Sequence, residues 1–378
     1  MKKFITKNFT LYTLHFTLSA LALLLVGCKE SGTGKVSATG SIYECLVVSS
    51  ESVYEEVKSV MEADMPCLPQ MEPYFKVMHV VPSQFDSYLK PTRNILIIDI
   101  DSVRYSELKA KINRDAWSHP QAVYRIQSPS REAFDTYWAT NGETVREWFV
   151  NEEIQRQTRF YRASTNKDAR HILQRDFHCD LLIPEDYMLI MDTTLNLSAA
   201  DVLSAEGGLS ASKASGLTGA AGLSASAVHL TWCCNNKGPM RRDLIIYAYP
   251  YADKRTFTLD YLCQKRDEVL GQVVTASVEG SYMGTEYRIF PPQYRVLQAQ
   301  RSDSTAVIPY TAEIRGLWKI YGGEAMGGPF VSHTVLDEQH QQVITAEAFL
   351  YAAGQKKRNA LRQAEAILYT LTLQQENE

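Results

Sequence analysis

Short apolar runs and helical patterns alternate along the first part of the chain. Continuous or alternating apolar stretches predict strands at residues 44–49, 74–81, 94–100 and 122–127. Apolar spacings of three and four predict helices at residues 52–61, 105–113, about 134–149 and about 152–173. Strands that alternate with helices are typical of an α/β layer, so we expect one in this half.

The second part is richer in strands. We expect them at residues 181–183, 188–191, 228–233, 244–249, 282–289, 311–320, 330–336 and 342–351, with a hairpin turn at 337–340. A helix is predicted at about 259–270, and the chain closes with an amphipathic helix over about 356–373. Successive strands joined by short turns favour antiparallel pairing.

Three short matches connect the two parts in the same order: 96–98 with 244–246, 114–115 with 266–267, and 124–126 with 287–289. The number of residues between the two members of a match grows along the chain, as insertions in a duplicated strand–helix–strand unit would produce. Matches this short also arise by chance. The prediction is an α+β protein of two related α/β halves, 42–175 and 176–378, with mostly antiparallel sheets and a C-terminal amphipathic helix.

Residues 198–227 interrupt the second half with a segment of low complexity. Ala, Ser and Gly account for 21 of these 30 residues. Such a composition buries too little apolar surface to offset the loss of chain entropy. We therefore expect a flexible insertion without a function of its own.

The N-terminus has the features of an export signal. Three lysines precede residues 8–27, which contain no charged side chain, and the motif Leu25-Val26-Gly27-Cys28 closes this stretch. An uncharged stretch of this length would also suit a single membrane anchor, but its ending is the lipobox pattern of bacterial lipoproteins. We expect a signal peptide at 1–27 and an acylated Cys28, whose lipid holds the protein on the bilayer.

The residues that follow bear on location. Residues 28–41 are rich in Gly, Ser and Thr and would form a flexible tether between the lipid and the folded part. Lys29 follows the cysteine, which favours transport to the outer membrane, and the acidic run that accompanies export to the cell surface is missing here. The expected location is the outer membrane, facing the periplasm.

Composition argues against two classes of protein. The chain has 378 residues, 22% of them charged, and a net charge of −4. These values are ordinary for a globular protein. The chain lacks the excess of basic residues that a nucleic-acid-binding protein requires, so that class is excluded. No second long apolar run follows Leu25, so a polytopic membrane protein is excluded.

The cysteines after Cys28 are too sparse for a disulfide scaffold. Small buried thiols are the simpler interpretation, although an oxidising compartment would permit many pairings. These residues are Cys45, Cys67, Cys179, Cys233, Cys234 and Cys263. No Cys-x-x-Cys occurs and no two histidines have ligand spacing on one element, so we expect no metal and no cofactor.

The sequence contains no familiar catalytic motif. What remains is a tract near the C-terminus that could form a ligand-binding groove. Its glycines allow close approach of the backbone, and its aromatic side chains could line the groove. Its charged side chains could hold a polar ligand. The candidates are Asp267, Tyr282, Glu286, Arg315, Trp318, Gly327 and Gly328. Alternatively, the glycines form bulges and turns of a twisted sheet, with Trp318 in its core.

Six short motifs carry a resemblance to a known family. They are Pro69-Gln70-x-Glu72-Pro73, Arg93-Asn94-Ile95-Leu96, Trp117-x-x-Pro120-Gln121, Gly280-Ser281-Tyr282-Met283, Arg315-Gly316-Leu317-Trp318 and Met326-Gly327-Gly328-Pro329-Phe330. In this order they resemble the domain-of-unknown-function 4837 family of Bacteroidota lipoproteins, over about residues 41–373, with 198–227 as an insertion. The resemblance implies an envelope location and no particular activity.

Three functional hypotheses remain open. The first is a non-enzymatic role, in which the anchored protein binds an envelope protein or serves as an accessory factor. The second is a hydrolase-like envelope enzyme that uses Glu286 or Asp267 with Arg315 as an electrostatic partner. The third is a small-ligand-binding lipoprotein with a groove near Trp318.

Overall fold

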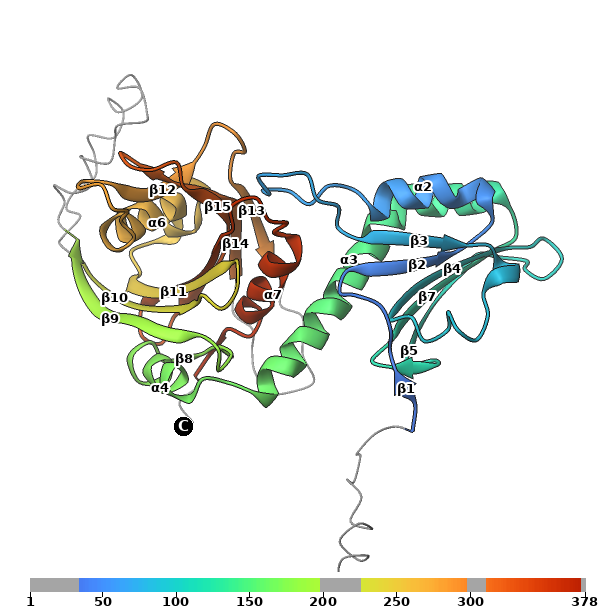
Figure 1. Ribbon diagram of the computed structural model, residues 1–378, viewed down its shortest axis with the longest axis horizontal. Helices are drawn as coiled ribbons and strands as arrows, with labels where there is room; N and C mark the ends of the chain where they lie inside the picture. The colour runs from blue at the N-terminus through green and yellow to red at the C-terminus, as the bar shows by residue number, and fades with distance from the viewer. Residues whose placement is uncertain (1–33, 198–225, 298–310, 375–378) are drawn as a thin grey trace, which may run out of the picture.

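The computed structural model describes residues 34–197, 226–297 and 311–374, which form two lobes joined by a long helix (Figure 1). The N-terminal lobe and the long helix comprise β1 (Val36–Ser37), β2 (Glu44–Val48), α2 (Glu51–Met61), β3 (Lys76–Val80), η1 (Pro82–Gln84), β4 (Asn94–Ile100), β5 (Lys109–Arg114), β6 (Ser118–His119), β7 (Ala122–Ser128) and α3 (Arg131–Ala163). The rest of the described chain comprises α4 (Lys167–Asp176), β8 (Cys179–Asp180), β9 (Met188–Leu197), β10 (Ser226–Asn235), β11 (Arg241–Pro250), η3 (Lys254–Phe257), α6 (Leu259–Val273), β12 (Tyr282–Glu286), β13 (Gln293–Leu297), β14 (Thr311–Tyr321), β15 (Gly327–Asp337), β16 (Gln342–Tyr351), α7 (Arg358–Leu368) and β17 (Thr372–Leu373).

The N-terminal lobe is a five-stranded sheet in the order β3-β2-β4-β7-β5. Strands β2, β3, β4 and β7 are parallel, and β5 runs antiparallel to β7. Helices α2 and α3 cover one face, where Val47, Leu96 and Ile126 join the main core, and a smaller cluster with Trp117 covers the other. Parallel neighbours need long connections, which is why helices alternate with strands in this part of the sequence.

The C-terminal lobe is built on an eight-stranded antiparallel sheet in the order β12-β14-β15-β16-β11-β10-β9, with β13 also paired to β14. Helix α6 packs on one face through Leu262 and Leu270. Helix α7 packs on the other through Leu361 and Ile367. Because both faces are covered, β15 and β16 are buried almost throughout, including polar residues such as His333 and Glu347.

The structure corrects three predicted helices. Residues 105–113 do not form a helix, and most of them belong to strand β5, whose six residues are all exposed at the sheet edge. The helix expected at 152–173 is the end of α3 followed by α4. The helix expected at 356–373 ends with α7, and β17 instead pairs with β8.

The α+β class with two halves is confirmed, but the two sheets differ in kind. Three of the four strand pairings in the N-terminal sheet are parallel, whereas the C-terminal sheet is antiparallel. The suggested duplication fails for the same reason. Residues 96–98 and 244–246 both lie in strands, but 114–115 lie at the end of β5 and 266–267 within α6, so the matched units do not have the same element order.

A buried carboxylate joins the two lobes. Glu72, in the loop between α2 and β3, accepts hydrogen bonds from the backbone nitrogens of Lys357 (2.6 Å) and Arg358 (3.2 Å) at the start of α7. Lys357 is the N-cap residue of α7 and makes no side-chain cap bond of its own. Negative charge at a helix N-terminus satisfies free amides and the helix dipole. The N-terminal lobe therefore supplies the cap of a C-terminal helix.

We expect Glu72→Ala to lower the free energy of unfolding by about 1–2 kcal/mol, the usual cost of losing a helix cap. The matched control is Glu55→Ala, because Glu55 is exposed on α2 and its loss should change the free energy by less than about 0.5 kcal/mol. Guanidinium titration measures both values. Equal losses in the two variants would contradict the capping role.

Candidate functional site

Strand β14 decides where several of the candidate residues point, because successive side chains of a strand face opposite sides of the sheet. Arg315 faces α7 and forms an ion pair with Glu365 of that helix. Trp318 faces α6, and its ring packs against Phe349 with the ring centroids 5.7 Å apart. Arg315 and Trp318 therefore lie on opposite faces of the sheet and do not share a site.

A buried ion network around Arg315 joins the sheet to α7. Arg315 donates from Nε to Glu313 (2.8 Å) and also binds Glu365, to which Arg362 donates at 3.0 Å. His333 Nε2 lies 3.1 Å from the Glu313 carboxylate. Burial opposes the ionisation of Glu313, but Arg315 and His333 outweigh it and hold its pKa well below the usual range. The network fastens α7 to β14 and β15.

Asp267 belongs to a second buried cluster, on the α6 face. It accepts hydrogen bonds from the backbone nitrogen and the hydroxyl of Thr285, at 2.8 and 2.7 Å. The preceding Arg266 binds Glu347 at 2.7 Å and lies over the ring of Phe330. Burial raises the pKa of Glu347, although Arg266 opposes the shift. Asp267 thus anchors α6 to β12.

Glu286 ends β12 and is held by internal partners. It forms an ion pair with Lys319 and accepts a hydrogen bond from the backbone nitrogen of Arg288 at 2.7 Å. Burial opposes ionisation, but Lys319 and the Arg288 amide prevail, so the pKa of Glu286 lies below its usual value. Arg315 is bound to other carboxylates, so the suggested pairing of Glu286 or Asp267 with Arg315 is not formed.

Gly327 and Gly328 make room for Trp318. The indole Nε1 of Trp318 donates to the backbone oxygen of Leu350 at 3.1 Å. A Cβ at Gly328 would lie 2.0 Å from that oxygen, and one at Gly327 would lie 2.7 Å from the backbone oxygen of Trp318. Tyr282 stacks on a tyrosine of β14 at a centroid distance of 5.4 Å. These residues serve close approach and packing.

The motif residues of the N-terminal half have similar roles. Arg93 forms an ion pair with Glu153 of α3 at 2.6 Å, and Asn94 donates to the same carboxylate at 2.7 Å. Gln121 donates to the backbone oxygen of Thr92 at 2.8 Å. These contacts fasten α3 and the neighbouring loops to the sheet.

The six cysteines in the described part of the chain are free and buried. They are Cys45, Cys67, Cys179, Cys233, Cys234 and Cys263. Burial raises the pKa of the Cys233 and Cys263 thiols to about 12, so neither forms the reactive thiolate near neutral pH. Cys28, the predicted acylation site, lies outside the described residues.

We therefore expect none of these six thiols to react with Ellman's reagent at pH 8 in the folded protein, because reaction requires an accessible thiolate. In guanidinium the number of reactive thiols per chain should be six if Cys28 is acylated and seven if Cys28 is free. Absorbance at saturation measures the count. Rapid reaction of a described cysteine before unfolding would contradict its burial.

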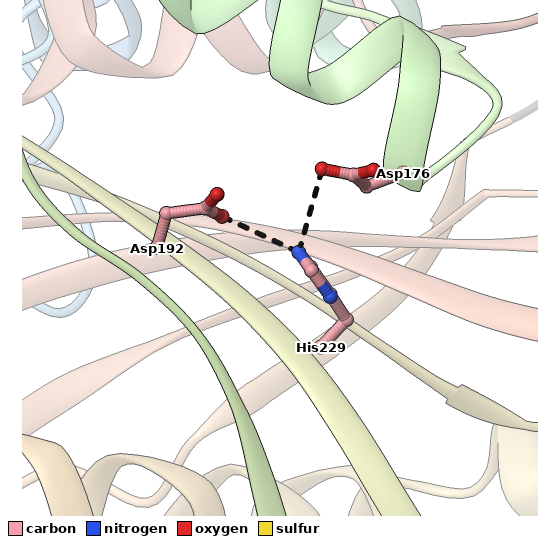
Figure 2. A group of neighbouring side chains, drawn as sticks. All are labelled: Asp176, Asp192 and His229. Atoms are coloured by element: carbon pink, nitrogen blue, oxygen red, sulfur yellow. Dashed lines mark hydrogen bonds and ion pairs between the residues drawn. The ribbon is translucent and has the colours of Figure 1, made fainter.

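Three side chains with metal-ligand chemistry meet where α4 ends against β9 and β10 (Figure 2). His229 Nε2 lies 3.3 Å from Asp192 Oδ1 and 3.8 Å from Asp176 Oδ2. The three ligand atoms all lie within 4.8 Å of one another, and the side chains are partly exposed. Carboxylate and imidazole groups in this arrangement have the chemistry to hold a divalent cation.

Sequence reasoning missed this group because it looked for ligands on one element. Asp192 and His229 lie on adjacent antiparallel strands but are 37 residues apart, separated by the low-complexity segment. Treating 188–197 and 226–235 as the two strands of one hairpin would have brought the pair together. Asp176 would still have needed the tertiary structure, since it comes from a helix end.

Two family models match the chain. Residues 223–370 match the domain of unknown function DUF4837, and residues 38–162 match the domain of unknown function DUF8532. The DUF4837 match confirms the predicted resemblance over the C-terminal part of the chain, whereas the motifs at 69–73, 93–96 and 117–121 lie in the DUF8532 match. The DUF4837 match contains the buried networks around Arg315 and Arg266, whereas Glu72 lies in the DUF8532 match. No curated protein matches the chain significantly.

Proposed function

We propose that this protein is a lipid-anchored component of the outer membrane that faces the periplasm and binds another envelope protein without catalysing a reaction. The observation that carries the binding role is the free edge of the C-terminal sheet at β9. Among the described residues, β9 pairs with β10 alone. Its first three residues, Met188, Leu189 and Ile190, are 49%, 43% and 48% exposed.

An edge with consecutive exposed apolar residues is suited to pairing with an extended segment of a partner. The unpaired backbone groups of β9 would form the hydrogen bonds, and the apolar side chains would contribute burial on association. Soluble proteins usually protect such edges with charges, prolines or covering loops. The residues at the start of β9 carry none of these charges, which favours a partner over a free surface.

The enzyme alternative is less well supported. A hydrolase built on Glu286 or Asp267 needs that carboxylate near Arg315 and open to a substrate. Instead, Glu286 is bound to Lys319, Asp267 to Thr285, and Arg315 to two glutamates of its own network. Trp318 lies in the core, which also weakens the proposal of a small-ligand groove beside it.

The anchoring part of the proposal rests on the lipobox pattern before Cys28. Within the described residues, none of the helices has the length and apolar character needed to cross a bilayer. Its test is Cys28→Ser, which removes the acceptor of the lipid. We expect the wild-type protein to fractionate with outer membranes and the variant to leave the membrane fraction. A variant that stays in that fraction would contradict anchoring by Cys28.

The binding part is tested by a photocrosslinking amino acid placed at Leu189 in intact cells. We expect one discrete crosslinked species with an envelope protein, and its loss when Ile190→Lys is added, because a buried lysine opposes strand pairing. The matched control is the same crosslinker at Val103, which is 93% exposed in the other lobe. Identical products from both positions would contradict a partner at β9.

A further inference from the structure

We propose that Asp176, Asp192 and His229 form a binding site for one divalent transition-metal ion, with Zn²⁺ as the reference probe. The site is distinct from the proposed edge-strand contact, because its ligands are side-chain atoms, whereas strand pairing would use the unpaired backbone groups of β9. Asp176 comes from the end of α4, Asp192 from β9 and His229 from β10 (Figure 2). These elements bring together two carboxylates and one imidazole that sequence spacing had kept apart.

The distances agree with a shared ion. Metal–nitrogen and metal–oxygen bonds are about 2.1 Å long, so neighbouring ligand atoms lie about 3.0–3.4 Å apart at octahedral or tetrahedral angles. His229 Nε2 lies 3.3 Å from Asp192 Oδ1 and 3.8 Å from Asp176 Oδ2, close to these values. Small side-chain rotations would therefore complete the coordination of all three ligands.

The imidazole is oriented for this role. Thr194 Oγ1 lies 3.3 Å from Nδ1 of His229, and the ring of Phe177 packs edge-on against the imidazole with the centroids 4.8 Å apart. A hydroxyl both donates and accepts, so Thr194 accommodates the tautomer with a proton on Nδ1 and a free Nε2. Thr231 also donates to Asp192 Oδ1 at 2.8 Å, which positions the second ligand.

Charge around the group also favours a cation. Both carboxylates are aimed at the one Nε2 of His229, which has at most one proton to donate. Arg175 is a further nearby cation: its Nε donates to Asp176 Oδ1 at 2.7 Å, and a terminal nitrogen binds Asp176 Oδ2 and lies 3.9 Å from Asp192. A bound ion would therefore replace Arg175 at Asp176 Oδ2.

Two carboxylates and one imidazole leave coordination positions for water, as in open metal sites. The side chains are 19–29% exposed, which gives an ion access from solvent. A bound ion would tie the end of α4 to β9 and β10. These strands lead into and out of residues 198–225, so the ion would stabilise the sheet where the low-complexity segment is attached.

The test is calorimetric titration of the full chain with ZnCl₂ and, separately, MnCl₂ after chelator treatment. We expect one Zn²⁺ per chain, and a rise in the unfolding midpoint of about 5 °C or more at a hundredfold excess over Kd. Asp192→Asn and His229→Gln should each weaken binding by roughly tenfold or more, because each removes a direct ligand. Asp168→Asn, an exposed aspartate at the other end of α4, is the matched control and should bind as the wild type does.

The variant Arg175→Gln distinguishes a metal site from a cluster held together only by internal ion pairs. Removal of a neighbouring cation should strengthen Zn²⁺ binding several-fold, because it removes charge repulsion. A cluster held together by Arg175 alone would lose stability and gain no affinity. Absence of Zn²⁺ binding, or equal binding by wild type and the two ligand variants, would overturn the proposal. Circular dichroism of each metal-free variant controls for folding.

Discussion

Glu347→Gln should lower the free energy of unfolding by about 3–5 kcal/mol, because it leaves the Arg266 cation buried without its main counter-charge. The two side chains are 0% and 2% exposed, and they share three hydrogen bonds of 2.7–3.0 Å. Glutamine keeps the size and part of the hydrogen bonding but not the charge. Asp267, at 3.2 Å from Arg266, offers only partial compensation because it is also bound to Thr285.

A double variant provides the control for this pair. Arg266→Met combined with Glu347→Leu removes both charges and replaces them with apolar groups of similar volume, so most of the lost stability should return. Guanidinium unfolding followed by tryptophan fluorescence gives the free energies of all members of the cycle. A loss below about 1 kcal/mol for Glu347→Gln would show that water or another carboxylate compensates the Arg266 cation.

Gly328→Ala should cost about 3 kcal/mol or more, because the added Cβ meets the backbone rather than a movable side chain. That atom would lie 2.0 Å from the oxygen of Leu350 and 3.1 Å from Nε1 of Trp318. The methyl group would separate β15 from β16 and break the hydrogen bond from Trp318 to Leu350. The unfolding midpoint and the near-ultraviolet signal of Trp318 should both change.

Gly271→Ala is the matched control for this substitution. Its Cβ would meet Met283 O at 3.5 Å, an ordinary contact, and the residue lies within α6. Alanine favours helix more than glycine does, so the variant should be unchanged or more stable by about 0.5 kcal/mol. If Gly328→Ala were as stable as Gly271→Ala, the close packing of β15 on β16 would be contradicted.

The agreement between sequence and structure follows the strength of the local signal. Residues 94–100 were predicted as a strand and form β4 with the same ends, because a run of buried aliphatic side chains is visible without its neighbours. Strand β5 was not predicted, and a helix was expected in its place, because its residues are exposed and only pairing with β7 makes them a strand. The last predicted helix was too long because Leu371 continues its apolar stripe, whereas the pairing of β17 with β8 ends it.

The candidate site shows the same division. Sequence pattern singled out Gly328, Arg315 and Trp318, and the structure gives each a definite role in close packing or in a buried ion network. The sequence pattern did not reveal that successive side chains of β14 face different helices. The partners of Arg315 lie 2 and 50 residues away, and no local pattern indicates the second.

By itself, the sequence determined the α+β class, most strand positions and the distinctive N-terminal pattern, because these depend on the order of apolar, polar and charged residues over short distances. The tertiary structure alone decided which distant groups meet. It brought Glu72 to the start of α7 and His229 to Asp176 and Asp192. Such contacts depend on how whole elements pack, and packing is set by the surfaces of several elements together rather than by the residues next to each group.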